Sequence, residues 1–143
     1  MITPIMTAIR PAGTRDLDEV AAIQHASPEA SQWQPRDYLA HDFRVAILDG
    51  AVAGFVAVRR VAPDECEILN LAVAPEHRRK GVGRALLGVF LGRLGDTIFL
   101  EVRESNTSAR EFYKSLGFQE VNRRPEYYHH PLETGIVMKF HSC

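Results

Sequence analysis

The sequence is poor in cysteine and in long apolar runs. Its 143 residues include only two cysteines, Cys66 and Cys143. A small secreted domain held together by disulfides needs more cysteines than this. We therefore expect a reducing, cytoplasmic location, with Cys66 as a small buried apolar residue and Cys143 as a thiol at the chain end. The N-terminal segment lacks the basic and apolar regions of a signal peptide, and no run approaches about 18 apolar residues, so we expect no membrane association.

A surplus of charge of one sign is also missing. The chain has 17 Lys and Arg against 18 Asp and Glu, for a net charge of −1. Without a strong positive field we expect no nucleic-acid partner, and any anion site must come from a local cluster of bases. Hydrophobic residues make up 45% and charged residues 24%, as in soluble globular domains. Length and composition predict one domain over residues 1–143, without repeats or linkers.

The hydrophobic periodicity predicts alternating strands and helices. The expected strands cover 7–11, 43–48, 52–61, 66–73, 97–103, 118–121 and 133–140. The expected helices cover 14–25, 34–41, 82–94 and 106–116. Asp49 and Gly50 predict a hairpin turn, Gly54 predicts a bulge or a close backbone approach, and the aromatic segment between 121 and 133 is expected to be a long connection. This order predicts an α/β fold in which a mixed sheet carries helices on both faces.

The segment from Leu71 to Ala85 joins the end of a strand, a basic turn and the start of a helix. The turn holds Arg78, Arg79, Lys80, Gly81, Val82, Gly83 and Arg84. A helix start offers unpaired N–H groups and the positive end of the helix dipole, and glycine lets a ligand oxygen approach the backbone. The pattern predicts a phosphate site, with a solvated basic helix start as the alternative. It is neither a P-loop nor a dinucleotide fingerprint, because Val89 and Leu86 stand where those motifs require lysine and glycine.

These residues resemble a known family. Arg78 to Gly83 fits the [QR]-x-x-G-x-[GA] signature of the GNAT superfamily of N-acetyltransferases. The resemblance is closer to the RimI type, the ribosomal-protein-alanine N-acetyltransferases, and lies in segments 68–87, 98–118, 123–128 and 136–140. It implies the GNAT fold, a mostly antiparallel mixed sheet of about seven strands with four helices. It also implies direct acetyl transfer from acetyl-CoA as co-substrate, without a metal. The stretch 92–96 is shorter than expected for RimI, on the side away from the coenzyme.

The resemblance also implies roles for individual residues. The coenzyme would contact Leu71, Ala72, Val73, Arg78, Arg79, Lys80, Gly81, Val82, Gly83, Arg84 and Asn106. Within this set, the strand edge at 71–73 would hold the pantetheine and the thioester carbonyl, and the turn would hold the pyrophosphate. Trp33, Tyr127 and Tyr128 would lie on the substrate side. Glu101 matches the general base and Tyr113 matches the general acid.

The residue pattern leaves alternatives open for both catalytic candidates. Ile98, Leu100 and Val102 share one face of their strand, and Phe99, Glu101 and Arg103 share the other. A carboxylate in an apolar strand needs a partner or a function. Glu101 is either a base, whose low ordinary pKa burial would have to raise, or half of an ion pair with an arginine. Tyr113 is either a proton donor to a thiolate or a core aromatic residue.

The acceptor substrate also has alternatives. Adjacent His129 and His130 point apart on an extended chain, so we expect solvated histidines and no metal, with the neighbouring tyrosines lining a substrate slot. A protein α-amine has a pKa of about 7.7–8.0 against about 10.4 for lysine, so more of it is neutral and reactive at neutral pH. The resemblance points to the N-terminal alanine of a small-subunit ribosomal protein. The alternatives are a small amine, an aminoglycoside or an internal lysine, or a coenzyme-binding module without catalysis.

Overall fold

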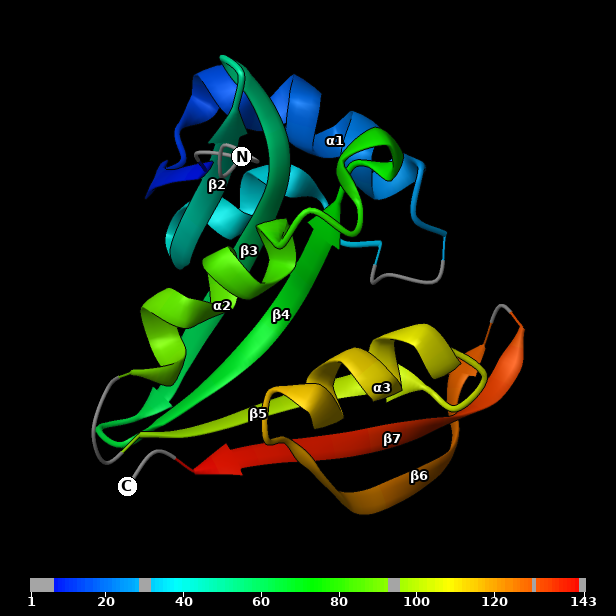
Figure 1. Ribbon diagram of the computed structural model, residues 1–143. Helices are drawn as coiled ribbons and strands as arrows, with labels where there is room; N and C mark the ends of the chain where they lie inside the picture. Colours follow the sequence, from blue (N-terminus) through cyan, green and yellow to red (C-terminus); the bar gives the residue numbers. More distant parts are fainter. Residues whose placement is uncertain (1–6, 29–31, 93–95, 130, 142–143) are drawn as a thin grey trace, which may run out of the picture. The chain divides into compact units, whose positions relative to one another are not determined.

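The computed structural model describes residues 7–28, 32–92, 96–129 and 131–141. The strands are β1 (Thr7–Pro11), β2 (Asp42–Leu48), β3 (Ala51–Ala62), β4 (Glu65–Val73), β5 (Thr97–Arg103), β6 (Gln119–His129) and β7 (Leu132–His141) (Figure 1). The α-helices are α1 (Leu17–His25), α2 (Val82–Leu91) and α3 (Thr107–Ser115), and the 3₁₀ helices are η1 (Thr14–Asp16), η2 (Pro35–Ala40) and η3 (Pro75–His77). No helix in these described ranges is long and apolar enough to cross a membrane.

The strands follow the order β1-β2-β3-β4-β5-β7-β6 in a sheet of seven strands. Pairing is parallel between β4 and β5 and antiparallel in the β1–β2, β2–β3, β5–β7 and β6–β7 ladders. This confirms the mixed, mostly antiparallel sheet that was expected. The chain divides into two compact units, one formed by Met1–Arg59 with Leu69–Phe90 and the other by Arg60–Ile68 with Leu91–Cys143.

In the first unit, β2 and β3 form the hairpin that the sequence predicts. Asp49 and Gly50 have φ angles of 52° and 81°, as a tight hairpin turn of the I′ type requires. The register shifts between Ala46 and Ile47, opposite Gly54. A Cβ atom on Gly54 would lie 2.9 Å from the carbonyl oxygen of Ala72, which confirms the expected close approach.

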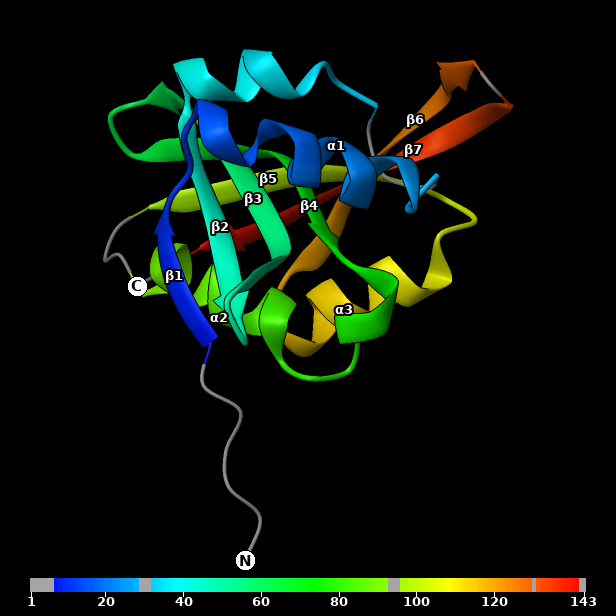
Figure 2. The same ribbon diagram turned by 90° about the horizontal axis from the view of Figure 1, so that it is seen from above.

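Helices cover both faces of the strands in this unit (Figure 2). On the face of α1 and η2, the ring of Tyr38 packs 5.4 Å from Phe43 and 5.6 Å from Phe55. On the opposite face α2 approaches β3 so closely that a Cβ atom on Gly54 would meet Val82 at 3.2 Å. The start of α2 is therefore anchored to the centre of the sheet, which fixes the basic turn before it.

Two predicted helices differ in detail from the structure. The helix expected from residue 14 opens as the 3₁₀ helix η1, because buried Asp16 binds Arg10 and the Gly13 N–H group and tightens the first turn. The buried residues of α1 are Val20, Ile23 and Gln24. The helix expected over 34–41 is the 3₁₀ helix η2. The helix expected to reach residue 94 is helical as far as Leu91, and residues 93–95 lie outside the described residues.

In the second unit, β5 pairs with β4 over Glu65–Glu67 and with β7 along its whole length. Burial alternates along β5, which confirms its predicted two faces. Helix α3 covers one of them, since the ring of Phe118 packs 5.4 Å from Tyr113 and 5.4 Å from Phe140. Phe140 pairs with Ile98, so the face of Ile98 is the one beneath α3.

The prediction of a long connection after residue 121 is wrong. Strand β6 continues to His129, and β7 begins at Leu132. Pro125 cannot donate to a sheet ladder. However, β6 ends the strand order, and proline is tolerated on edge strands. The register shifts between Arg124 and Tyr128, and Glu126 has a φ angle of 57°, so the segment is a bulged strand.

Candidate active site

The basic turn before α2 has the backbone conformation of an anion cradle. Arg79 and Gly81 have φ angles of 64° and 82°, and α2 starts at Val82. A positive φ at arginine is uncommon and is retained where the surrounding structure requires it. Turns of this kind direct successive N–H groups into a concavity. The Ala85 N–H group donates to the Gly81 carbonyl over 3.0 Å, so the helix begins directly after the turn.

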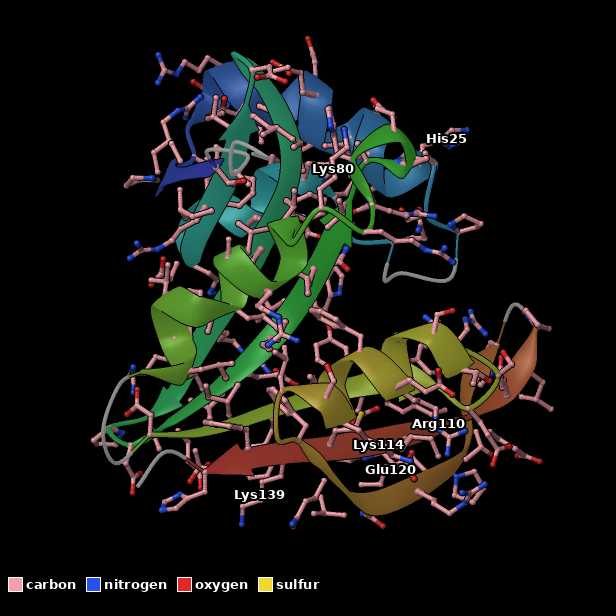
Figure 3. The ribbon with its side chains drawn as sticks, in the orientation of Figure 1. His25, Lys80, Arg110, Lys114, Glu120 and Lys139 are labelled. Carbon is pink, nitrogen blue, oxygen red and sulfur yellow. The ribbon has the colours of Figure 1, made fainter. Side chains whose placement is uncertain are left out.

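The side chains around this cradle are cationic and open to solvent. Arg79, Lys80 and Arg84 are exposed, and Figure 3 shows Lys80 on the turn. The first turn of α2 has no acidic residue. Among the described residues, no ion pair involves these three cations. Their charge therefore stays available for a bound anion such as a diphosphate.

The Arg78 side chain makes hydrogen bonds within the fold, and its contact with the coenzyme stays a prediction. Its Nη2 atom donates to the Ser27 hydroxyl over 2.9 Å, and its Nε atom donates to the Val73 carbonyl over 3.3 Å. Its backbone N–H group donates to Pro75 over 3.4 Å. The guanidinium thus holds the turn against the end of β4 and the segment after α1.

A buried polar network that the sequence did not indicate supports two predicted site residues. The Tyr38 hydroxyl donates to Gln24 over 2.7 Å and accepts from Asn70 over 3.0 Å. Asn70 accepts from the Leu71 N–H group over 3.0 Å, and Gln24 donates to the Trp33 carbonyl over 2.5 Å. Burial raises the pKa of Tyr38 to about 12, so this hydroxyl stays protonated. The network fixes the backbone at Leu71 and at Trp33, whose side chain is exposed.

In the second unit, Glu101 lies on the β5 face opposite α3 and has two different oxygens. Its Oε1 atom is 3.1 Å from Nη1 of Arg124 on β6. Its Oε2 atom is buried and has no hydrogen-bond partner in the described part of the chain. Burial is the main cause that raises the pKa of Glu101, and Glu67 raises it further, while Arg124 and Tyr127 oppose the rise. Glu101 is thus both an ion-pair partner and a carboxylate of increased basicity.

The two tyrosines of β6 lie beside Glu101. Their rings meet edge to face at 5.0 Å, with Arg124 over Tyr127 at 5.4 Å and Arg103 over Tyr128 at 4.4 Å. Burial raises the pKa of Tyr128 to about 12, whereas the Tyr127 side chain is 45% exposed. The structure therefore brings the predicted base together with Tyr127 and Tyr128, whereas the third predicted substrate residue, Trp33, belongs to the first unit.

Tyr113 does not lie with Glu101 and the two tyrosines of β6. It lies on α3, is only 6% exposed, and packs 5.3 Å from Phe112 and 5.4 Å from Phe118. Since α3 covers the Ile98 face of β5, Tyr113 and Glu101 lie on opposite faces of that strand. Burial raises the pKa of Tyr113, which keeps its proton on the oxygen.

Asn106 caps α3. Its side-chain oxygen accepts from the Ala109 N–H group over 3.2 Å, as an N-cap residue does. Arg110 and Lys114 then bind Glu120 of β6 over 2.7 Å and 3.3 Å, which ties α3 to the edge strand (Figure 3). The contact of Asn106 with a coenzyme remains a prediction.

Of the two histidines expected to be solvated, His129 is exposed. His130 lies outside the described residues. Cys66 is buried as expected, and Cys143 also lies outside the described residues. Within the described ranges, His, Cys, Asp and Glu do not gather in threes that could hold a metal ion.

The chain is similar to known proteins over most of its length. The model of the acetyltransferase (GNAT) family matches residues 13–118. The [ribosomal protein bS18]-alanine N-acetyltransferase of Escherichia coli K12 is 43% identical over 84 residues, which is 56% of this chain and 56% of that protein. The chain therefore spans little more than half the length of this curated relative.

Solved structures align over more of the chain. The crystal structure of Ard1 from Thermoplasma volcanium has a TM-score of 0.86 and 30% identity, covering 96% of this chain and 98% of that one. The crystal structure of the ribosomal-protein-S18-alanine N-acetyltransferase from Escherichia coli has a TM-score of 0.77 and 32% identity, covering 94% and 93%.

Proposed function

The chain belongs to the acetyltransferase (GNAT) family, and we propose that it transfers an acetyl group from acetyl-CoA directly to the α-amine of a protein N-terminus. The observation that carries this proposal is the turn at Arg79 and Gly81, where positive φ angles and exposed cations precede a helix start. We propose that both compact units belong to one acetyltransferase domain over residues 1–143. The similarity to N-terminal acetyltransferases supports this acceptor class over other amines.

The first unit would bind the co-substrate. The N–H groups at the start of α2, together with Arg79, Lys80 and Arg84, suit the two phosphates of a diphosphate group. The edge of β4 over Leu71, Ala72 and Val73 would hold the pantetheine arm. Acetyl-CoA supplies an activated thioester, and the Val73 N–H group would donate to its carbonyl oxygen as negative charge develops there.

The second unit would carry out the proton transfers of the reaction. Glu101 would take a proton from the acceptor ammonium, directly or through water, so that the amine nitrogen can attack the acetyl carbon. The new C–N bond forms as the C–S bond breaks, and the Tyr113 hydroxyl would donate its proton to the leaving thiolate. The second proton lost by the attacking nitrogen would restore the Tyr113 hydroxyl, through water. The raised pKa of Glu101 supports its role, since a more basic carboxylate is a better acceptor. Asn106 would contact the coenzyme at the start of α3.

The finer assignment of the acceptor follows the named relatives. We propose an N-terminal alanine of a small-subunit ribosomal protein as the substrate, acetylated in the cytoplasm. Trp33 in the first unit, and Tyr127 and Tyr128 in the second, are the residues that we propose to contact the peptide. The exposed aromatic surface of Trp33 and Tyr127, each 45% exposed, supports a peptide in preference to a small amine.

A turnover assay with matched acceptors tests this proposal. The acceptors are an alanine-initiated peptide, the same peptide with a blocked N-terminus and an internal lysine, and an aminoglycoside. Release of free thiol and the mass of the peptide report transfer, and calorimetry reports acetyl-CoA binding. We expect transfer to the free N-terminus. Transfer only to lysine or to the aminoglycoside would contradict the acceptor class, and binding without transfer would indicate a coenzyme-binding module.

A further inference from the structure

The ion pair between Glu101 and Arg124 reaches across a strand. Arg124 on β6 pairs in register with Gly135 on β7, and Gly135 pairs with Arg103 on β5. Glu101 lies two residues from Arg103, so it shares the same face of β5. The guanidinium of Arg124 must therefore extend over β7 to bring Nη1 to 3.1 Å from Glu101 Oε1.

Gly135 leaves the space that this contact needs. A Cβ atom at this position would lie 3.3 Å from Glu101 Oε2 and 3.1 Å from Cδ2 of the Tyr127 ring. The lack of a side chain on Gly135 allows the carboxylate, the ring and the guanidinium to meet over β7. Tyr127 is 45% exposed, so a surface side chain lies beside the buried Oε2 atom.

We propose that Arg124 is a positioning residue for Glu101, which it holds through Oε1 so that Oε2 remains the oxygen that accepts the proton of the acceptor amine. This inference rests on the proposed function. A carboxylate free to rotate presents either oxygen in many directions, whereas one fixed at Oε1 presents Oε2 in one direction. General base catalysis depends on such fixed geometry.

The groups around Glu101 act on its charge in opposite directions. Burial and Glu67 on β4 raise its pKa, while Arg124 and Tyr127 on β6 lower it. The side chain of Tyr128 also interacts with its charge. Without Arg124, burial and Glu67 remain, so the pKa of Glu101 rises further and more of the base is protonated in weakly acidic solution.

Substitutions of the two neighbouring arginines test this inference in the full chain. Arg124→Met removes the guanidinium, and Arg124→Lys retains a cation. Arg123→Met is the matched control, because Arg123 pairs with Glu104 instead. NMR titration of the Glu101 side-chain carboxyl carbon, assigned with Glu101→Gln, measures the pKa without any reaction. We expect Arg124→Met to raise it by about one pH unit, Arg124→Lys to restore part of the difference, and Arg123→Met to leave it unchanged.

Acetyl transfer to a peptide gives the second readout. We expect Arg124→Met to lower kcat by about tenfold or more with a smaller change in KM, and to move the acidic limb of the pH profile upward. An unchanged Glu101 titration in Arg124→Met overturns the inference, and so does a shifted titration with an unchanged transfer profile. Absence of transfer by the wild-type chain contradicts the proposed function instead, while the titration still decides whether Arg124 controls the charge of Glu101.

Discussion

The guanidinium of Arg78 donates to the hydroxyl of Ser27 over 2.9 Å, across 51 positions of the chain. Arg78 is the first residue of the family signature, yet its side chain is used within the fold. We predict that Arg78→Leu lowers the free energy of unfolding by about 1 kcal/mol, the usual value of such hydrogen bonds. Arg79→Leu should leave stability unchanged and weaken acetyl-CoA binding. Denaturant unfolding and calorimetry measure the two effects, and a stable Arg78→Leu variant would contradict the assignment.

Gly83→Glu tests the anion cradle. A carboxylate in the first turn of α2 repels a diphosphate and competes for the same N–H groups, so we predict loss of acetyl-CoA binding in a folded protein. Gly88→Glu is the matched control, since Gly88 lies in the same helix and a Cβ there meets nothing within 4 Å. Calorimetry should show near-normal affinity for the control. Equal affinity of both variants would exclude a coenzyme site at this turn.

Tyr113→Phe tests the general acid. The substitution removes only a hydroxyl from a ring packed between Phe112 and Phe118, so stability and affinities should change little. Turnover should fall by roughly 10²–10⁴, the usual contribution of a positioned acid. Steady-state kinetics measure this, and wild-type turnover would identify Tyr113 as a core aromatic residue.

Tyr38→Phe makes the same chemical change with a different expected result. The Tyr38 hydroxyl has two buried partners, Gln24 and Asn70. Its removal leaves both amides short of a partner, so we predict a loss of about 1–3 kcal/mol in unfolding free energy. Chemical denaturation measures the loss. A variant as stable as the wild type would show that the two amides find other partners.

Glu101→Gln separates a base from a structural ion pair. Because the pKa of Glu101 is raised, the folded chain holds this proton more tightly than the unfolded chain. The stabilisation is complete below the unfolded pKa of about 4.3 and is lost as pH rises through the folded pKa. At neutral pH the ionised carboxylate therefore does not stabilise the fold, and Glu101→Gln should melt no lower than the wild type.

The same variant should transfer acetyl slowly at neutral pH. It should recover in part at higher pH, where the α-amine loses its proton to bulk water. Rates measured from about pH 6 to about pH 9 check this expectation. A lower melting temperature with a pH profile of unaltered shape would instead identify Glu101 as half of a structural ion pair.

Local signals predicted the turn at Gly50 and the two faces of β5, because each depends on residues adjacent in sequence. The pairing of Glu101 with Arg124 was not predictable in this way. It depends on the continuation of β6 to His129, beyond the strand end predicted at residue 121, and on a register shift before Tyr128. The network of Gln24 with Asn70 joins residues 46 positions apart, and no spacing rule connects them.

The irregularity of β6 has a consequence for the behaviour of the chain in concentrated solution. An edge strand with a regular row of free N–H and C=O groups can template the addition of a strand from another molecule. In β6, Pro125 lacks an N–H group, and the positive φ at Glu126 turns the backbone out of the regular pleat. These two residues interrupt the edge beside the tyrosine pair and thereby oppose the intermolecular strand pairing that leads to aggregation.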